Sequence, residues 1–405
     1  MPRVIRRAYL LHFTRASQGS DASVELPRGD QEYHLRGRGQ STPDLVTIRW
    51  NDSLLEQLEA LREHAEGDVG EAAARVGRAR GEVVDGTSWW ARAQEIAALS
   101  PETPVFLTVR SDAAELYLLP WELLRLGSLA HAAALPKLLI RYELPDVPVA
   151  PRLEGLSVTK RGRVIFAWSA AGGKVDAARH VQIIEKALDA GRGLFDDARD
   201  RGFTEVKNAS RETIRDALER AKEAREPVAI LHLLCHGAAR DDGTFGLALD
   251  GVDGDGSKDV VTPSGVQRLL REYAGLVRLV VISACDSGNA GAVGNALGSV
   301  AHEVYRAGFA AVIASRFPLS WDGARAFAAV FYERLAVELD SLEDAFLAAR
   351  AKLSRMESHD WASLQLYARE SDGDATHVFN ARPYQGLAAF KPEHARFFFG
   401  REREI

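Results

Sequence analysis

From Gly162 onward, short apolar runs alternate with segments of helical spacing, and this alternation constrains the fold more than any other feature. The apolar runs lack the polar alternation of a half-exposed strand, as expected for strands covered on both faces. The expected strands are Arg163–Ala167, Val228–Leu234, Leu279–Ile282 and Ala310–Ala314. The expected helices are Ala177–Ala190, Arg211–Ala224, Ser299–Ala307 and Gly323–Leu335. Strands separated by crossover helices predict an α/β fold with a mainly parallel sheet.

The first 155 residues predict a smaller α/β unit. The expected strands are Ala8–Phe13 and Leu45–Trp50, with a strand pair at Pro104–Val109 and Ala114–Leu119. The expected helices are Leu54–His64 and Gly67–Arg80. Three prolines, Pro145, Pro148 and Pro151, mark a boundary. We therefore predict a supporting unit over 1–155, a larger unit over 156–380 and a connector over 381–405.

Composition excludes several classes of protein. The chain has 405 residues, a formal net charge of −6 and both signs of charge spread along it, so no basic stripe indicates nucleic-acid binding. No run approaches the ~20 apolar residues of a membrane span, and the amino terminus lacks the pattern of a signal peptide. The two cysteines, Cys235 and Cys285, cannot form a disulfide framework. We expect a cytoplasmic protein that binds neither nucleic acid nor membrane.

Two reactive side chains follow neighbouring apolar runs. His236 ends the run that begins at Val228, and Cys285 follows the run Leu279–Ile282 through Ser283 and Ala284. Ligands of open parallel sheets bind at the carboxyl ends of strands. An imidazole there can act as general base and stabilise a thiolate nucleophile. We predict His236 as the base and Cys285 as the nucleophile, with backbone amides near Gly237 and Cys285 holding the oxyanion.

The motifs around these residues resemble a known family. "LHLLCHG", "VVISACDSG" and "AGFAAVIASRFPLSWDGARAFAAVFYERL" are similar to the CHAT family, caspase-like peptidases of clan CD, and "LYLLPWELL" with "LLIRYELP" resembles its amino-terminal half. Cys285 lies 49 residues after His236, which agrees with caspase order. The resemblance spans roughly residues 100–370. It implies a caspase-like α/β/α sandwich preceded by a smaller α/β pseudo-caspase half, with His236 and Cys285 as the catalytic dyad. The chain departs from the family at Phe317, where tryptophan is common.

The carboxyl end carries a second resemblance. "PYQGLAAFKPEHARFFFGREREI" is similar to the segment that enters a STAND-type signalling NTPase, although the chain has no G-x-x-x-x-G-K-[ST] phosphate loop. The resemblance implies an NTPase or sensor module carboxyl-terminal to residue 405. It also implies regulated proteolysis of a protein or peptide substrate, in bacterial defence or cell-death-like signalling.

The substrate pocket is expected beside Cys285. The candidate residues are Asp286, Ser315, Arg316, Trp321 and Asp322. Trp121 is expected to pack in the core. The chemistry proposed needs no metal and no cofactor.

Other sites are open to consideration but lack their motifs. Cys235 is a neighbouring thiol, but strand parity turns it away from the face of His236. His232, His236 and Cys285 could bind zinc, but no paired-ligand motif is present. The glycines Gly288, Gly291 and Gly294 do not match the dinucleotide fingerprint. The stretch Asp250–Asp259, with aspartates also at 253 and 255, lacks the calcium-loop order and is expected to be a solvated loop.

Two alternative functions belong to other classes. A catalytically silent interaction module would keep the fold and need no thiolate. A nucleotide-dependent enzyme is disfavoured because the phosphate loop is missing.

Overall fold

A computed structural model describes most of the chain, in segments separated by gaps. The described residues are 6–16, 27–63, 76–77, 83–84, 86–100, 102–124, 135, 137–145, 147–156, 161–194, 201–240, 245–251, 257–284, 297–316, 319–356, 358, 360–369 and 377–379. The expected helix Gly67–Arg80 lies almost wholly outside them.

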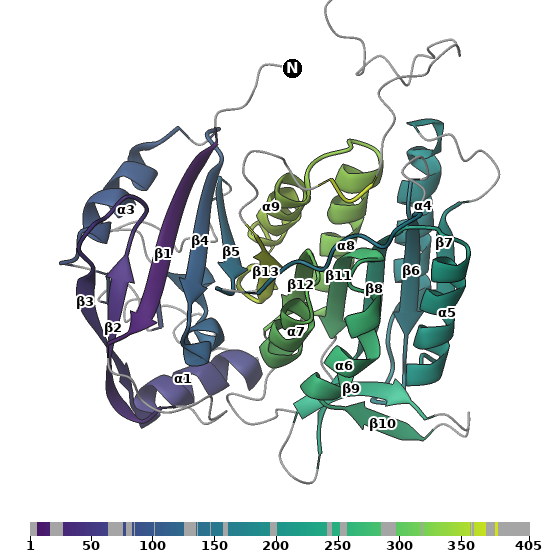
Figure 1. Cartoon of the computed structure of the whole chain (residues 1–405), viewed down its shortest axis with the longest axis horizontal. Helices are drawn as coiled ribbons and strands as arrows, with labels where there is room; N and C mark the ends of the chain where they lie inside the picture. The colour runs from purple at the N-terminus through teal and green to yellow at the C-terminus, as the bar shows by residue number, and fades with distance from the viewer. Residues whose placement is uncertain are drawn as a thin grey trace, which may run out of the picture.

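The described strands form one 13-stranded sheet that runs through the whole molecule (Figure 1). Its main path is β10-β9-β8-β11-β12-β13-β5-β4-β1-β2-β3, and β6 and β7 extend it beside β8. In the carboxyl-terminal half, β7, β6, β8, β11 and β12 are mutually parallel. The predicted α/β class with a mainly parallel central sheet is therefore confirmed.

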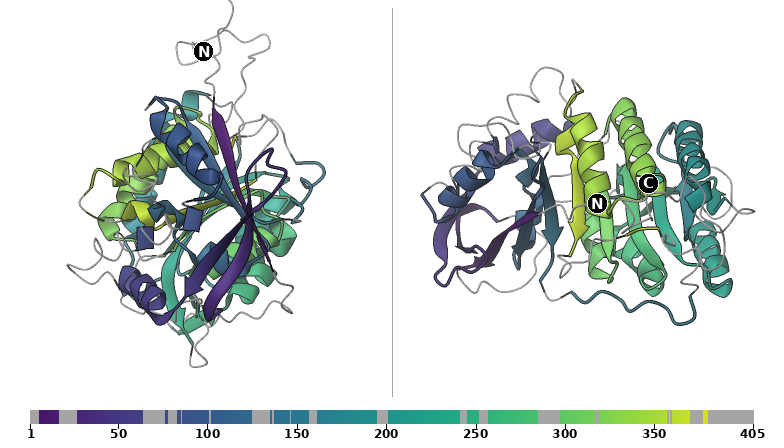
Figure 2. Two further views of the ribbon diagram at one scale, coloured as in Figure 1. Left: turned by 90° about the vertical axis from the view of Figure 1, so that its left-hand side faces the viewer. Right: turned by 90° about the horizontal axis from the view of Figure 1, so that it is seen from above.

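The carboxyl-terminal half is a three-layered sandwich (Figure 2). Helices α4, α8 and α9 pack together on one face, and α5, α6 and α7 pack on the other. The strands are β6 (Arg163–Trp168), β7 (Phe203–Val206), β8 (Val228–Ala239), β9 (Phe245–Asp250), β10 (Lys258–Val261), β11 (Val277–Ala284), β12 (Ala311–Ser315) and β13 (Leu364–Ala368). The helices are α4 (Ala177–Ala190), α5 (Arg211–Glu223), α6 (Pro263–Leu270), α7 (Leu297–Arg306), α8 (Trp321–Ala336) and α9 (Leu342–Leu353).

Short hydroxyl side chains start several of these helices. Ser210 accepts a hydrogen bond from the Thr213 amide in a capping box. The same kind of bond, from a backbone amide of the first turn, is accepted by the side chains of Thr262, Ser320 and Ser341. These bonds satisfy amides that have no partner inside a helix. No described helix has the length and apolar character needed to cross a membrane.

The amino-terminal half is built around β1, which pairs in parallel with β4 and antiparallel with β2. The strands are β1 (Arg7–Arg15), β2 (Gly29–Arg36), β3 (Asp44–Trp50), β4 (Val105–Ser111) and β5 (Leu138–Glu143). The helices are α1 (Asp52–Glu63) and α3 (Trp89–Ala98), followed by the 3-10 helices η1 (Ala114–Leu118) and η2 (Trp121–Leu123).

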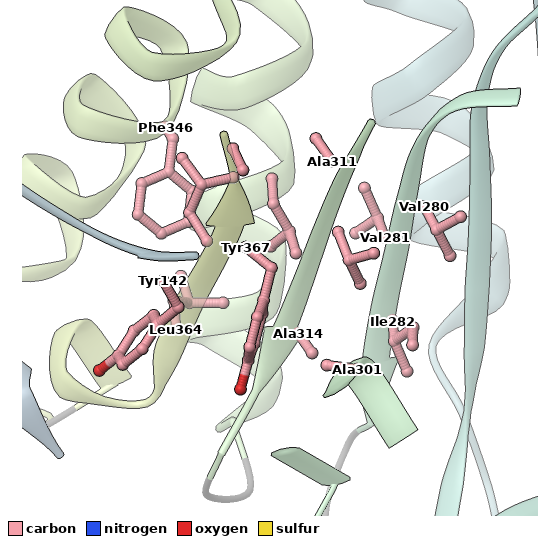
Figure 3. Packing of buried hydrophobic residues seen from close by; sticks show 14 of the residues in the cluster. Tyr142, Val280, Val281, Ile282, Ala301, Ala311, Ala314, Phe346, Leu364 and Tyr367 are labelled. Carbon is pink, nitrogen blue, oxygen red and sulfur yellow. The ribbon is translucent and has the colours of Figure 1, made fainter. Parts of the chain in front are cut away.

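The two halves meet where β13 pairs with β5. Tyr367 of β13 lies opposite Tyr142 of β5, with ring centroids 5.4 Å apart (Figure 3). Phe346 of α9 and Ala314 of β12 lie beside these rings in the same apolar region. The buried apolar side chains of both halves form one continuous cluster, so the halves share a core.

The sequence-based expectations fare unevenly. The four strands and four helices expected after Gly162 are present with small differences in their ends, as are the strands expected at Ala8–Phe13 and Leu45–Trp50. The strand expected at Ala114–Leu119 is wrong, because this segment forms η1. The loop expected at Asp250–Asp259 is also wrong at both ends: Asp250 ends β9, and Asp259 lies in β10.

Candidate active site

His236 lies at the point where β8 leaves the main sheet. Up to Cys235, β8 pairs with β11, and Cys235 is the partner of Ala284. From His236 onward, β8 pairs with β9, and His236 is the partner of Ala248. The strand therefore does not end at His236, as its sequence suggested, but continues as one arm of a hairpin. Backbone pairing before and after His236 therefore fixes the position of its Cα, from which the imidazole extends.

The His236 side chain is 1% exposed and has a defined orientation. Its Nε2 lies 3.2 Å from the carbonyl oxygen of Lys174, in the loop between β6 and α4. A carbonyl can only accept, so Nε2 donates this hydrogen bond, and in the neutral ring Nδ1 is the nitrogen that can accept a proton. Gly172 allows this contact, because a Cβ there would lie 2.6 Å from the Cβ of His236.

The β6–α4 loop is attached to the start of α8. The carboxylate of Asp176 pairs with Arg325 Nη1 at 3.2 Å, and Arg325 also pairs with Asp322. The ammonium group of Lys174 lies 5.9 Å from the ring centroid of Trp321. An ion pair and a cation–π contact therefore join the β6–α4 loop to α8, and they hold the backbone that carries the Lys174 carbonyl.

The predicted nucleophile follows β11 directly. Cys285 and Asp286 lie outside the described residues, and the last described residue before them is Ala284. Ala284 pairs with Cys235, the residue immediately before His236. The backbone that leads into Cys285 is therefore adjacent to the backbone that leads into His236.

The other predicted site residues fall into two groups. Trp321 is 38% exposed, and the side chain of Asp322 is 74% exposed, so both are accessible at the start of α8. Ser315 and Arg316 are 0% and 4% exposed and lie in the interior. The Arg316 guanidinium donates to the Tyr117 carbonyl at 3.1 Å and to the Tyr142 hydroxyl at 3.2 Å.

Gly237 has a packing role that its sequence did not reveal. The position of a Cβ on Gly237 is filled by the ring of Phe245, on the paired strand β9. A larger residue would push this ring out of place. The hairpin therefore needs glycine here independently of any contact between its amide and a ligand.

Comparison with known proteins identifies the fold family. The family model of the CHAT domain matches residues 91–369, which is more than half of the chain. The chain belongs to the CHAT domain family.

Solved structures resemble this CHAT protein only distantly. Two structures of the Saccharomyces cerevisiae separase–securin complex match at 13% identity, with TM-scores of 0.36 and 0.35. Each match covers 65% of this chain but only 15% and 16% of the separase chain, respectively. A structure described as "Structure of Protease" matches at 11% identity and a TM-score of 0.39, covering 78% of this chain and 75% of the other. No curated protein matches the chain.

A second histidine of the CHAT domain has both ring nitrogens occupied. His232 Nδ1 lies 2.9 Å from the Tyr332 hydroxyl, and His232 Nε2 lies 2.9 Å from the Ser283 hydroxyl. Burial, and secondarily the neighbouring His180, hold the pKa of His232 well below its usual value, so the ring is neutral. His232 therefore links α8 to β11 two residues before Cys285 and has no nitrogen left for a metal.

The described part of the CHAT domain contains no group of three or more His, Cys, Asp or Glu residues placed to hold a metal ion. The other candidate residues from the sequence are buried or bonded where the structure describes them. Cys235 is buried at 1% exposure, and Asp259 is engaged by Arg211 at 2.6 Å. Trp121 is fully buried, and its Nε1 donates to the Leu116 carbonyl at 2.8 Å. The segment with Gly288, Gly291 and Gly294 lies outside the described residues.

Sequence reasoning missed two parts of this site. One is the Lys174 carbonyl, because any residue type supplies a carbonyl and the contact spans 62 positions. The other is Glu122, which is 0% exposed, accepts from the Tyr142 hydroxyl at 2.8 Å and lies 3.9 Å from Arg316. A signal for Glu122 was present, since a carboxylate inside the apolar run LYLLPWELL requires a buried partner.

Proposed function

We propose that this protein is a caspase-like cysteine endopeptidase, with His236 as general base and Cys285 as nucleophile. The observation that carries the proposal is the 3.2 Å contact between His236 Nε2 and the Lys174 carbonyl. The contact favours the tautomer in which Nδ1 is the basic nitrogen. A general base needs a fixed direction, and a second group that orients the imidazole supplies it.

The strand register supports a short distance between the two reactive residues. Cys285 is bonded to Ala284, His236 is bonded to Cys235, and Ala284 and Cys235 are partners on adjacent strands. Adjacent strands are ~4.8 Å apart, so the two residues that directly precede the dyad members in the chain are neighbours in the sheet.

The proposed reaction follows from these groups. His236 Nδ1 takes the thiol proton of Cys285, and the thiolate attacks the scissile carbonyl carbon. Backbone amides at Gly237 and Cys285 stabilise the oxyanion, a contribution of about 3 kcal/mol for each well-placed donor. His236 then protonates the leaving amine, and water releases the acyl group from the sulfur.

The accessible candidates for substrate contact are Trp321 and Asp322. Both lie at the start of α8, next to the loop that orients His236. An indole ring that is partly exposed offers a flat apolar surface for a substrate side chain, and a carboxylate favours a basic one. Asp286 stays a candidate from its position beside Cys285. Ser315 and Arg316 would have to act from the interior.

We also propose that proteolysis is regulated, in bacterial defence or cell-death-like signalling in the cytoplasm. The support is the resemblance of residues 383–405 to the entry of a STAND-type NTPase, a segment outside the described residues. A switch module after residue 405 would then control access of a protein substrate to the site. Measuring cleavage by a longer chain with and without ATP tests this part separately.

Thiol reactivity tests the dyad without knowledge of the substrate. The full chain is treated with iodoacetamide across a pH series, and labelling of each cysteine is followed by mass spectrometry. Cys285 is expected to react at a pH where an ordinary thiol, with a pKa near 8.5, does not, and His236→Ala is expected to remove this advantage. A positional-scanning peptide library provides the cleavage assay.

Cys235→Ala is the matched control, because it removes the other cysteine and leaves the dyad intact. Cleavage that survives Cys285→Ala contradicts the proposal. A Cys285 that reacts no faster than an ordinary thiol, combined with partner binding unaffected by His236→Ala and Cys285→Ala, would instead favour the silent interaction module.

A further inference from the structure

A buried histidine of β8 lies close to the predicted dyad. His232 precedes His236 by four residues in the same strand, so strand parity places the two side chains on the same face. The His232 side chain is 1% exposed. Its two ring nitrogens contact the Tyr332 hydroxyl of α8 and the Ser283 hydroxyl of β11, each at 2.9 Å. His232 is therefore bonded to two elements that border the site, although it is not a member of the dyad.

The bond to Ser283 holds the end of the strand that leads into Cys285. Ser283 is the second-last residue of β11 and comes two residues before Cys285. Its backbone is the register partner of Leu234 in β8, and its hydroxyl contacts His232, which lies two residues earlier in β8. A backbone link and a side-chain link therefore both join the end of β11 to β8.

A second buried histidine joins His232 to the loop that orients His236. His180 of α4 packs edge-on against the His232 ring, with centroids 6.0 Å apart. The Nδ1 atom of His180 donates to the carbonyl of Asp176 at 3.0 Å, and Asp176 directly precedes α4. Asp176 belongs to the β6–α4 loop, whose Lys174 carbonyl contacts His236. The His232 ring therefore supports this loop as well as the end of β11.

The surroundings hold the His232 ring in one orientation. Phe166 of β6 packs edge-on against it, with centroids 5.2 Å apart, and the Tyr332 ring lies nearly parallel to it at 6.0 Å. A rotation of the imidazole would break its bonds to Ser283 and Tyr332 and leave buried polar groups without partners, which is costly. Four elements, β6, α4, α8 and β11, therefore meet at one fixed side chain.

We propose that His232 is a positioning residue for the dyad. It holds the end of β11 through Ser283, which places the Cys285 thiol near the imidazole of His236. Through His180 it also supports the loop that orients that imidazole. Both of its nitrogens are already bonded, so His232 takes no part in the proton transfer itself. The proposal rests on the endopeptidase function proposed above, because a positioning role needs a dyad on which to act.

Ser283→Ala tests the link to β11 with almost no change in volume. In the full chain it is expected to lower kcat for peptide cleavage by about three- to tenfold with KM unchanged, because the thiol is less well placed. The rate of Cys285 labelling by iodoacetamide should fall by a similar factor at neutral pH, since the imidazole then stabilises the thiolate less. A rise in KM with kcat unchanged would assign Ser283 to substrate binding and overturn the proposal.

Tyr332→Phe removes the other bond to His232 and keeps the aromatic ring. It is expected to slow Cys285 labelling by about two- to fivefold. Tyr305→Phe is the matched control, because Tyr305 is also 1% exposed but lies on α7, at the other face of the sheet. The control should keep the wild-type labelling rate and kcat. Circular dichroism confirms that both variants fold, and equal effects of the two on labelling would overturn the proposal.

A double-mutant cycle separates positioning from a general loss of stability. If Ser283 acts through His232, Ser283→Ala should add little to the loss of kcat in His232→Phe, whereas additive losses would overturn the proposal. If His232→Phe does not fold, Ser283→Ala and Tyr332→Phe form the cycle, with the same expectation.

Two further outcomes separate this proposal from the proposed function. Unchanged kcat and labelling in every variant of an active wild type would overturn the positioning role and leave the endopeptidase function standing. A wild-type Cys285 that reacts as an ordinary thiol would reject both.

Discussion

The carboxyl ends of strands are used differently in the two halves of the sheet. In the amino-terminal half, the Tyr117 hydroxyl closes the ends of β4 and β5: it accepts from the Ser111 amide at 2.7 Å and lies 2.8 Å and 2.7 Å from the Ser111 and Glu143 carbonyls. In the carboxyl-terminal half, the part of β8 that pairs with β11 leads into His236, and β11 leads into Cys285. The sheet architecture therefore does not by itself create an active site. The residues at the strand ends decide whether one is present.

The buried polar groups differ in the same way. The partners of the Tyr117 hydroxyl are backbone groups of Ser111 and Glu143, the last residues of β4 and β5. Around His236, the partner is a backbone carbonyl from a loop whose position depends on contacts with α8. Substitutions in the first region should act on stability, and substitutions in the second should act on chemistry.

Replacing His236 should produce the largest effect. His236→Ala is expected to lower kcat/KM for peptide cleavage by about 10⁴-fold, because the thiol loses its general base. The free energy of unfolding should change far less, as judged by urea denaturation. If His236→Ala unfolds instead of staying folded and inactive, the role of His236 in β8 is structural, like that of Tyr117 at the end of β4.

Removing Glu122 tests the joint between the halves. Glu122→Ala is expected to lower the free energy of unfolding by about 3–5 kcal/mol, because it leaves Arg316 buried without a carboxylate. Glu122→Gln keeps an acceptor for the Tyr142 hydroxyl and should cost less. Urea denaturation of both variants measures the difference, and a Glu122→Gln variant as stable as the wild type would argue against a charge interaction with Arg316.

Acid should destabilise the carboxyl-terminal half through its histidines. Burial, and secondarily Arg306, lower the pKa of His302 to about 4, from 6.5 in the unfolded chain. The unfolded state therefore binds the proton first, and stability is lost as pH falls from about 6.5 toward 4, by about 3 kcal/mol for this group. His302→Gln should flatten the pH dependence of unfolding over that window. An unchanged slope would assign the acid sensitivity to other groups, such as His180 and His232, whose pKa values burial also lowers.

The Tyr117 hydroxyl should matter for stability alone. Tyr117→Phe is expected to lower the free energy of unfolding by about 1–3 kcal/mol, because the Ser111 amide and two carbonyls lose their common partner. Thiol labelling of Cys285 should stay at the wild-type rate. A slower rate would mean that the two sets of strand ends are coupled.

The contact between the β6–α4 loop and α8 should have the smallest effect. Arg325→Ala is expected to lower kcat by up to about fivefold with little change in KM, because a partly exposed ion pair holds its partners only weakly. Rescue by Arg325→Lys would identify charge as the cause. Arg334→Ala is the matched control, since it removes another arginine of α8 from an ion pair, with Asp340, and keeps both Asp176 and Arg325. Equal losses in Arg325→Ala and Arg334→Ala would argue against a positioning role for the Asp176 contact.

The sequence alone predicts the carboxyl-terminal half well, because its strands are apolar on both faces and its helices carry clear amphipathic spacing. It fails at Ala114–Leu119, since a short apolar run is compatible with a strand or with a buried turn, and periodicity does not separate them. The 3-10 turn forms here because Pro120 and the packing of Trp121 against the Leu116 carbonyl close the chain on itself. The strands β5, β9, β10 and β13 also gave no decisive local signal.

The sequence by itself determined the order and spacing of His236 and Cys285, the glycines beside them, and the parity that separates Cys235 from His236. These are properties of neighbouring residues, so local chemistry carries them. Only the tertiary structure decided that β8 continues past His236, that the Lys174 carbonyl selects its tautomer, and that Arg316 is enclosed by Tyr142 and Glu122. These contacts join residues far apart in the chain, and a backbone carbonyl has no residue type by which a sequence could announce it.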